Sequence, residues 1–322
     1  MKEFSLIETQ VAIKYLKDKF EEALAKKLNL VRVSAPLFVR KDSGLNDNLN
    51  GFEETVSFIV GGENIEIVQS LAKWKRHALG EYNFPKGTGL YTDMNAIRKD
   101  EVMDRLHSIY VDQWDWEMII DESLRTKRYL FSVVSKIYSV IFKVANLSEK
   151  KWGFSYKLPK KIYKISTKEL EKLYPDKSPS EREYLITKEN RAVFIYQIGW
   201  PLKNKAPHDG RAADYDDWKL NGDIILFDDA IDAPIELSSM GIRVDKDSLV
   251  KQLKYKNELD KLDNPYCQSI INDKLPLTIG GGIGQSRLCM YYLQKKHIGE
   301  VQSSYWSKEV KEDAKKKGIK LL

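Results

Sequence analysis

A glycine-rich segment near the end of the chain has the composition of an anion-binding turn. The letters GGGIGQSR run from Gly280 to Arg287. Glycines let the backbone approach a ligand closely, and a helix starting near Gln285 offers unpaired N–H groups and the positive end of its dipole. Arg287, in the first turn of that helix, could then hold a phosphate. The spacing matches neither the Rossmann fingerprint nor a P-loop, and a plain tight turn explains it equally well.

Two further segments carry groups suited to a nucleotide with its metal. Arg98, in IRKDE, falls where a loop is expected to meet a strand and supplies a second cation for a triphosphate. Asp223 and Glu236 fall on the two strands of an expected hairpin, and carboxylate oxygens are the ligands that Mg²⁺ prefers. Each segment alone also fits an ordinary solvated surface.

The segment IELSSMGIR adds hydroxyl groups beside Glu236. Strand alternation puts Ser238 on the same face as Glu236. A bulge before Arg243 would free Ser239 and Gly241 from that alternation.

The segment SIYVDQWDWE, residues 108–117, predicts a strand with one polar and one aromatic face. Alternation places Gln113, Asp115 and Glu117 on a single side. Tyr110, Trp114 and Trp116 fall on the other.

Composition limits the class of protein. The 322 residues are 42% hydrophobic, 31% charged and 11% aromatic, which excludes a disordered or fibrous chain. No repeat or linker divides them, so we expect one catalytic domain over 1–322. Cys267 and Cys289 lack CxxC spacing, which supports neither a disulfide framework nor a zinc site.

Charge and hydropathy limit the partners. The net charge of +6 comes largely from lysine-rich stretches at 157–164 and 308–320 that lack interleaved aromatic residues, so we expect a solvated surface and no nucleic-acid partner. No apolar run approaches the ~18 residues of a membrane span, and the first residues carry no secretory signal. The expected location is therefore the cytoplasm, away from membranes.

The elements that must position these groups follow from periodicity and turn residues. A capping box at Ser5 and Glu8 starts a first helix. Strand 30–39 contains Pro36, which favours an edge position or an end there. The remaining expected elements are a hairpin at 55–68, helix 69–80, helix 123–146, an irregular basic insertion at 148–180, strand 192–200, hairpin 223–244, helix 247–259 and strand 277–284. Hairpin-joined strands with helices between them predict an α+β fold, a mostly antiparallel sheet flanked by helices.

Taken together, the segments resemble the class II aminoacyl-tRNA synthetases. Arg98, Glu236 and Arg287 resemble the second and third signature motifs of that class, and LVRVSAPLF resembles the first, which builds the dimer interface. QxDxE at 113–117 and QSLAKWK at 69–75 are most similar to the aspartyl and asparaginyl enzymes. The resemblance implies a class II synthetase-like catalytic core.

A narrower resemblance extends over nearly the whole chain. LNDNLNG, SLAKWKR, GLYTDMNAIR, YVDQWDWE, DYDDW, ELSSMGIRVD and TIGGGIGQSR are similar to the ammonia-dependent asparagine synthetases, the aspartate–ammonia ligases. This family implies a homodimer acting on L-aspartate, ATP and ammonia, without an anticodon-binding domain. Val111 departs from the synthetase pattern, which often has a nucleotide-stacking aromatic there, and Ala72 replaces a polar residue.

These resemblances imply a role for each candidate residue. An aspartate needs cations for its two carboxylates and an acceptor for its ammonium, and Lys75, Arg243 and Asp115 have those types. The implied aspartate-binding set is Lys75, Asp115, Asp216, Ser238, Ser239 and Arg243. The implied ATP-binding set is Arg98, Asp223, Glu236, Gly282 and Arg287, with Mg²⁺ on Asp223 and Glu236. The implied catalytic residues are Asp47, Arg98 and Gln113, and Asp47 and Asp216 are expected at the amino acid or the entering ammonia.

The implied reaction is formation of a β-aspartyl adenylate, with release of pyrophosphate, followed by displacement of AMP by ammonia. Either Asp47 or Asp115 could accept the proton that ammonium must lose, and bulk water could do so as well. The alternative is a synthetase paralogue that activates the α-carboxylate of aspartate or asparagine. An inactive core kept as a binding subunit is disfavoured, since Arg98, Glu236 and Arg287 are all present.

Overall fold

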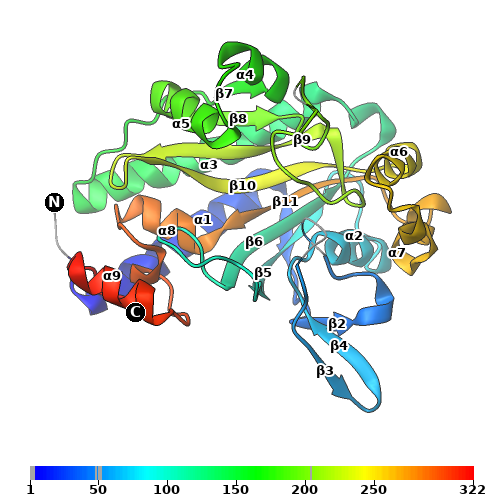
Figure 1. Cartoon of the computed structure of the whole chain (residues 1–322), viewed down its shortest axis with the longest axis horizontal. Coiled ribbons are helices and arrows are strands. Elements are labelled where there is room, and N and C mark those ends of the chain that lie inside the picture. Colours follow the sequence, from blue (N-terminus) through cyan, green and yellow to red (C-terminus); the bar gives the residue numbers. More distant parts are fainter. Residues whose placement is uncertain (1–3, 48, 50–52, 204) are drawn as a thin grey trace.

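A computed structural model describes residues 4–47, 49, 53–203 and 205–322, and its centre is an eight-stranded sheet (Figure 1). The strands lie in the order β1-β5-β6-β11-β10-β9-β8-β7. Their bounds are β1 Leu30–Arg32, β5 Gly89–Ile97, β6 Tyr110–Ile119, β7 Tyr163–Ser166, β8 Ala192–Tyr196, β9 Asp216–Asp228, β10 Ala233–Arg243 and β11 Thr278–Gly284.

The sheet is mostly antiparallel, as the hairpins predicted. The pairings from β5 through to β8 are all antiparallel. The two outermost pairings differ, because β1 runs parallel to β5 and β7 runs parallel to β8. Both edge strands are only three or four residues long, which limits the exposed edge.

Helices cover both faces of this sheet (Figure 1). Their bounds are α1 Leu6–Leu28, α2 Ala72–Glu81, α3 Lys127–Trp152, α4 Thr167–Leu173, α5 Pro179–Asn190, α6 Lys246–Lys256, α7 Pro265–Ile271, α8 Gln285–Tyr292 and α9 Lys308–Lys316. Short 3₁₀ turns lie at Lys41–Ser43, Glu122–Leu124, Leu259–Asp263 and Ile298–Glu300.

The main hydrophobic core lies between the sheet and helices α1, α3 and α8. The predicted capping box of Ser5 and Glu8 is formed at the start of α1. The aromatic face of β6 points into this core, where the Trp114 ring stacks on Phe20 with centroids 4.8 Å apart. The opposite face of β6, with Gln113 and Asp115, is therefore left for the site.

Helix α3 meets the length and composition of a membrane span, with a mean hydropathy of 1.4 over 18 residues. Half of that window is buried inside the protein. Leu130, Ile137 and Val144 all belong to the main core. This is the packing of a core helix.

A second, three-stranded sheet projects from the main body (Figure 1). It consists of β2 Phe38–Arg40, β4 Glu63–Ile67 and β3 Ser57–Val60, in that order. Gly61 and Gly62 have φ of 58° and 85° at the predicted turn between β3 and β4, a conformation that glycine adopts without strain. The strand expected at 30–39 is broken around Pro36 into β1 and β2, which belong to different sheets.

The insertion at 148–180 is more regular than the sequence suggested. Helix α3 continues to Trp152, and β7, α4 and the start of α5 follow. Strand β7 extends the main sheet, and α4 is capped by a capping box between Ser166 and Glu169. Within the insertion, residues 153–162 and 174–178 lack helix and strand.

Candidate active site

Two connected cavities lie on the polar face of the central strands. The larger has a volume of about 350 Å³ and the smaller of about 80 Å³. Residues lining both are Leu49, Arg98, Gln113, Tyr215, Ser239 and Gly282. A ligand in the smaller cavity would therefore touch one in the larger.

The glycine run on β11 makes room for the polar side chains of β6. Gly282 lies opposite Asp115, and a Cβ at Gly282 would overlap Oε1 of Gln113. A Cβ at Gly280 would likewise overlap Oε2 of Glu117. These glycines thus allow the side chains of β6 to lie flat across β11, in addition to any close approach of a ligand.

Buried ion pairs surround the smaller cavity. The Lys75 ammonium donates to Asp115 and, over 3.1 Å, to the carbonyl of Gly281. The Arg243 guanidinium donates to both carboxylate oxygens of Glu117 over 2.7–3.1 Å, and its Nη1 donates to Asp216 over 2.5 Å. The cations predicted for substrate carboxylates are thus fixed in place.

Burial shifts the pKa values of this cluster. Burial lowers the pKa of the Lys75 ammonium, and nearby Arg243 lowers it further. Burial raises the pKa of Asp216, although Arg243 opposes that shift. Glu117 and Asp216 outweigh burial at Arg243 and raise its pKa. Oδ2 of Asp115 is buried without a hydrogen-bond partner among the described residues, so it is available to a ligand's ammonium.

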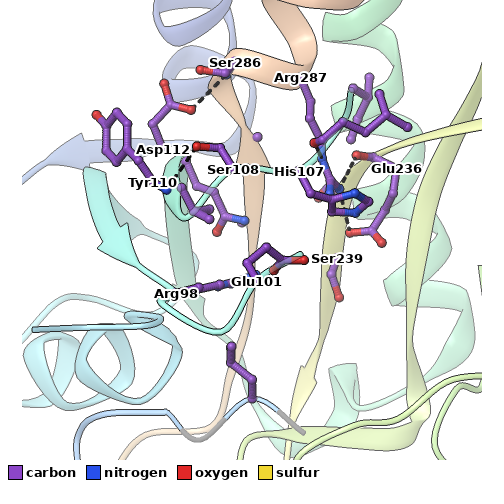
Figure 2. A pocket seen from close by; sticks show the side chains of 18 of the residues that line it. Arg98, Glu101, His107, Ser108, Tyr110, Asp112, Glu236, Ser239, Ser286 and Arg287 are labelled. Atoms are coloured by element: carbon purple, nitrogen blue, oxygen red, sulfur yellow. Dashed lines mark hydrogen bonds and ion pairs between the residues drawn. The ribbon is translucent and has the colours of Figure 1, made fainter. Parts of the chain in front are cut away.

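Two arginines enter the larger cavity from separate elements, as Figure 2 shows. Arg98 directly follows β5, and its Nε donates to the carbonyl of Gln69 over 3.2 Å. Arg287, in the first turn of α8, donates from Nη1 to the carbonyl of Glu236 over 3.1 Å and from Nε to that of Leu106 over 3.4 Å. Backbone carbonyls thus hold both guanidinium groups while leaving part of their positive charge for an anion.

One N–H group at the start of α8, that of Ser286, is already paired within the chain, which corrects the expectation of a free N–H group at this residue. Ser286 N–H donates to Oδ1 of Asp112 over 3.1 Å. Gln302 Nε2 and Lys17 Nζ also donate to Asp112, over 3.2 and 3.1 Å. The anion at this helix end is therefore a carboxylate of β6, and Arg287 is the charged group of this segment that lines the larger cavity.

The predicted metal-binding carboxylates are near each other but not directly opposite. A bulge at Glu236/Ser238 pairs Asp223 with Ser239 and Glu236 with Ile225. This bulge lets Glu236, Ser238 and Ser239 all line the larger cavity. Asp223 itself does not line the larger cavity. Its carboxylate forms an ion pair with the guanidinium of Arg211.

The chemistry of Asp223 nevertheless fits a cation. Its Oδ1 is buried without a partner among the described residues, while Oδ2 faces Arg211. Burial raises the pKa of Asp223 to about 7, and Glu236 and Asp209 add to this against Arg211. In the described part of the chain, no three His, Cys, Asp or Glu side chains form a metal cluster, so an ion here would need phosphate or water as further ligands.

Comparison with known proteins points to the same family as the sequence resemblance. A family model described as aspartate–ammonia ligase matches residues 7–318. The chain is 53% identical over 327 residues to the aspartate–ammonia ligase of Mycoplasmoides gallisepticum, covering 100% of both chains. It is 56% identical over 318 residues to that of Ruminiclostridium cellulolyticum, covering 98% of this chain and 95% of the relative. The chain belongs to the aspartate–ammonia ligase family.

Solved structures similar to this aspartate–ammonia ligase family member are class II synthetases. The asparaginyl-tRNA synthetase of Pyrococcus horikoshii complexed with asparaginyl-adenylate has a TM-score of 0.66 at 15% identity, covering 91% of this chain and 68% of that one. The asparaginyl-tRNA synthetase of Entamoeba histolytica, also with asparaginyl-adenylate, has a TM-score of 0.64 at 14% identity, covering 93% and 68%. The predicted class II synthetase-like core is thus confirmed, and identities this low concern the fold alone.

Most residues expected from the ligase resemblance lie at the two cavities. The smaller cavity is lined by Asp47, Lys75, Arg98, Gln113, Asp115, Asp216, Ser239, Arg243 and Gly282. The larger is lined by Arg98, Gln113, Glu236, Ser238, Ser239, Gly282 and Arg287. Cys267 and Cys289 are buried in hydrophobic clusters, as expected of core residues.

Three of the cavity residues that sequence reasoning on this ligase missed are polar groups suited to a ligand. Arg211 and Tyr215 come from the loop before β9, and His107 comes from the segment before β6. The sequence DGRAADYDDW indicates an acidic loop, but Asp216 was the one residue of this loop predicted to belong to the site. Arg211 could not be predicted as a site residue, because its partner Asp223 lies 12 residues later, on a strand, and the sequence does not show that the two meet.

Proposed function

We propose that the two cavities together carry out ATP-dependent amidation of L-aspartate by ammonia. Aspartate would occupy the smaller cavity and ATP the larger. The observation that supports this most is the shared lining at Arg98, Gln113 and Gly282, which would let an amino acid in one cavity contact a nucleotide phosphate in the other. Membership of the aspartate–ammonia ligase family points to the same reaction.

In the first step, a β-carboxylate oxygen of aspartate attacks the α-phosphorus of ATP, and the bond to the pyrophosphate oxygen breaks. Arg98, at the junction of the cavities, is suited to stabilise charge on the α-phosphate. Arg287, farther along the larger cavity, is suited to the outer phosphates. No nucleophilic side chain is needed, because positioning and electrostatics are enough for phosphoryl-group chemistry of this kind.

The aspartate is held by groups of opposite charge. Its α-ammonium would meet the unpartnered Oδ2 of Asp115. Its carboxylates would share the cations Lys75 and Arg243, which are already oriented by Asp115, Glu117 and Asp216. The Ser239 hydroxyl and the Gln113 amide line both cavities and are suited to the β-carboxylate where it meets the nucleotide.

In the second step, the nitrogen of ammonia attacks the carbonyl carbon of the mixed anhydride, and AMP leaves with the electrons of the C–O bond. Ammonium must first lose a proton. We assign the role of accepting this proton to the carboxylate of Asp47, which is buried and lines the smaller cavity.

Mg²⁺ would be held by Asp223 and Glu236. When bound there, it would neutralise charge on the phosphate oxygens. Arg211 would keep Oδ2 of Asp223 occupied, so that the unpartnered Oδ1 remains the available oxygen.

The assembly that we propose is a homodimer of a single-domain chain. Apolar side chains are exposed on the segment that resembles the first synthetase motif and on the helix before it, at Ile7, Val11, Val31 and Phe38. Large apolar side chains left exposed on these segments are what a protein interface would cover. ATP and aspartate are cytoplasmic metabolites, so we propose the cytoplasm as the site of reaction, with no nucleic acid or membrane partner.

One experiment separates this reaction from the alternative of α-carboxylate activation. Purified protein is incubated with aspartate, ATP and Mg²⁺, with ammonium, glutamine or hydroxylamine as the nucleophile. We expect asparagine with AMP and pyrophosphate from ammonium, and the β-hydroxamate from hydroxylamine. Recovery of the α-hydroxamate, or accumulation of aspartyl-tRNA when tRNA is added, would support the synthetase paralogue instead.

A further inference from the structure

Tyr215 lies where the two cavities meet. It is one of the residues that line both of them, and it belongs to the loop before β9. Its ring packs on the guanidinium of Arg243, whose Cζ is 5.7 Å from the ring centroid. No described residue forms a hydrogen bond with the Tyr215 hydroxyl. The ring is thus held against a cation predicted to bind a carboxylate, and the hydroxyl is left for a ligand.

Both chain neighbours of Tyr215 are fixed by buried ion pairs. On one side, Lys73 Nζ, from the first turn of α2, is 2.6 Å from Oδ2 of Asp214. On the other side, Nη1 of Arg243 donates to Oδ1 of Asp216 over 2.5 Å. All four charged side chains are almost fully buried. Lys73 and Asp214 line neither cavity, so what this costly pair provides is the position of the loop.

The backbone around Tyr215 is also held from outside the loop. Nε2 of Gln252, in α6, donates to the carbonyls of Ala213 and Asp216 over 3.0 and 2.9 Å. The N–H of Val244, just after β10, donates to the carbonyl of Tyr215 over 2.9 Å. The loop therefore fixes Tyr215 before any ligand arrives, which is the arrangement required of a group that must be placed accurately.

The hydroxyl of Tyr215 acts as a neutral hydrogen-bond donor. Burial raises its pKa well above the ordinary value. Asp47 and Asp216, which line the smaller cavity, add to this shift, while Arg211, which lines the larger, opposes it. The hydroxyl thus keeps its proton, and the charges that act on it belong to both cavities.

Two anionic groups are expected at the junction, the β-carboxylate of aspartate and the α-phosphate of ATP. A hydrogen bond to the attacking carboxylate would make that group a poorer nucleophile. A hydrogen bond to a non-bridging oxygen of the α-phosphate would stabilise charge in the transition state, alongside Arg98. The α-phosphate is therefore the acceptor that a donor at this place serves best.

We propose that the Tyr215 hydroxyl donates a hydrogen bond to a non-bridging oxygen of the α-phosphate, first in ATP and then in the β-aspartyl adenylate, and that Lys73 and Asp214 are its positioning residues. The inference rests on the proposed ligase reaction. The carboxylate oxygen forms the new P–O bond, and pyrophosphate leaves with the electrons of the old one. Tyr215 keeps its proton throughout, and no further reactant is required.

Tyr215→Phe removes the hydroxyl and keeps the ring against Arg243. We expect aspartate-dependent exchange of pyrophosphate into ATP to fall by about tenfold to 10²-fold, with the Kd for aspartate within about threefold of wild type. The matched control is Tyr255→Phe. The Tyr255 ring packs edge-to-face on Trp218, with centroids 6.0 Å apart, and lines neither cavity, so exchange should stay at the wild-type level. Unchanged exchange in Tyr215→Phe would overturn the inference.

Sulfur at the α-phosphate gives a readout that a purely structural role would not move. The two diastereomers of ATP with sulfur in place of one non-bridging α-oxygen differ in which oxygen is replaced, and sulfur accepts hydrogen bonds poorly. In wild type, the diastereomer with sulfur facing Tyr215 loses this hydrogen bond, whereas Tyr215→Phe lacks it with both. The ratio of kcat/KM between the diastereomers should therefore change by about fivefold between the two proteins. An identical ratio in both proteins would refute the contact.

Asp214→Asn tests the positioning role, because it breaks the ion pair with Lys73 and keeps the side-chain volume. We expect exchange to fall by about threefold to tenfold in wild type, and by less than twofold when Tyr215→Phe is already present. Lys73→Arg, which keeps the charge, should lose less than Lys73→Met.

Equal losses from Asp214→Asn with and without the Tyr215 hydroxyl would show that the ion pair does not act through it. A wild-type protein without aspartate-dependent exchange would instead refute the ligase reaction itself. Should Asp214→Asn fail to fold, the comparison of diastereomers in Tyr215→Phe still decides whether the hydroxyl contacts the α-phosphate.

Discussion

A Cβ at Gly282 would overlap Oε1 of Gln113, and it would lie 3.3 Å from Oδ1 of Asp115. The missing side chain on β11 is therefore what allows two polar side chains of β6 to extend across the neighbouring strand. Both Gly282 and Gln113 line the smaller and the larger cavity. The glycine shapes the place where amino acid and nucleotide are expected to meet.

The first prediction follows from that contact. Gly282→Ala should displace Gln113 and lower kcat/KM for aspartate by about tenfold to 10²-fold, since displacement of a reacting group by about 1 Å is enough for such a loss. The measurement is steady-state asparagine synthesis at varied aspartate concentration. Gly80→Ala, in α2 and outside both cavities, is the control for folding, because the nearest atom to its added Cβ is Cδ of Pro276, 3.4 Å away. Unaltered kinetics in Gly282→Ala would contradict a role for Gln113 at the reacting carboxylate.

The second prediction concerns Arg98 and Arg287, the arginines assigned to the phosphates of ATP. Arg98→Ala and Arg287→Ala should each lower kcat/KM by about 10²-fold or more, since each removes a charge-assisted contact to phosphate worth about 2–4 kcal/mol. Thermal unfolding should change little by comparison. The control is Arg40→Ala, because Arg40 is exposed and its ion pair with Asp42 lies outside both cavities. Near-normal activity in either cavity variant would rule out the assignment of that arginine to ATP.

Local sequence signals predicted the helices and strands best where a side chain fixes the backbone directly. The capping box at Ser5 marks the start of α1, and Gly61-Gly62 marks the turn of the small sheet. Most of the site residues that the synthetase and ligase resemblances implied line one of the two cavities. The order and direction of the strands were less accessible, because the parallel pairings of β1 and β7 depend on contacts between distant segments.

The groups that sequence reasoning missed are those whose partners are set by tertiary structure. Arg211 acquires its role through an ion pair with Asp223. Asp112 acquires its role by capping the start of α8, more than 170 residues away along the chain. Neither relationship has a periodic signal in the sequence. A bulge before Arg243 was raised as a possibility, and the pairing of β10 with β9 shifts register both at Glu236/Ser238 and at Gly241/Arg243. The positions of these shifts depend on how β10 packs between β9 and β11.

The third prediction tests the polar face of β6. Asp115→Asn should raise KM for aspartate by about tenfold or more, since it removes the anionic acceptor for the substrate ammonium and leaves Lys75 without its carboxylate partner. ATP affinity, measured by calorimetry in the same variant, serves as the internal control and should stay within about threefold of wild type. Loss of ATP affinity with unchanged aspartate affinity would mean that this face holds the nucleotide.

The last prediction concerns the pH dependence of metal binding at Asp223. Burial, reinforced by Glu236 and Asp209, raises the pKa of this carboxyl to about 7. A raised pKa means that the ionised form is present above pH 7 and is lost as the pH falls. Between pH 8 and pH 6 the ionised fraction falls from about 90% to about 10%, so Mg²⁺-dependent ATP affinity should fall by about tenfold.

Because ATP itself titrates in this range, the quantity to compare is the difference between wild type and Asp223→Asn, measured by calorimetry in the same buffers. Asp223→Asn should bind Mg²⁺ and ATP weakly, with the residual pH dependence of the nucleotide alone. Arg211→Met provides the opposite test. Arg211 is the group that lowers the pKa of Asp223, so its removal should move the midpoint of metal binding to higher pH. A midpoint that stays in place in Arg211→Met, or a pH dependence that persists unchanged in Asp223→Asn, would show that another group binds the ion.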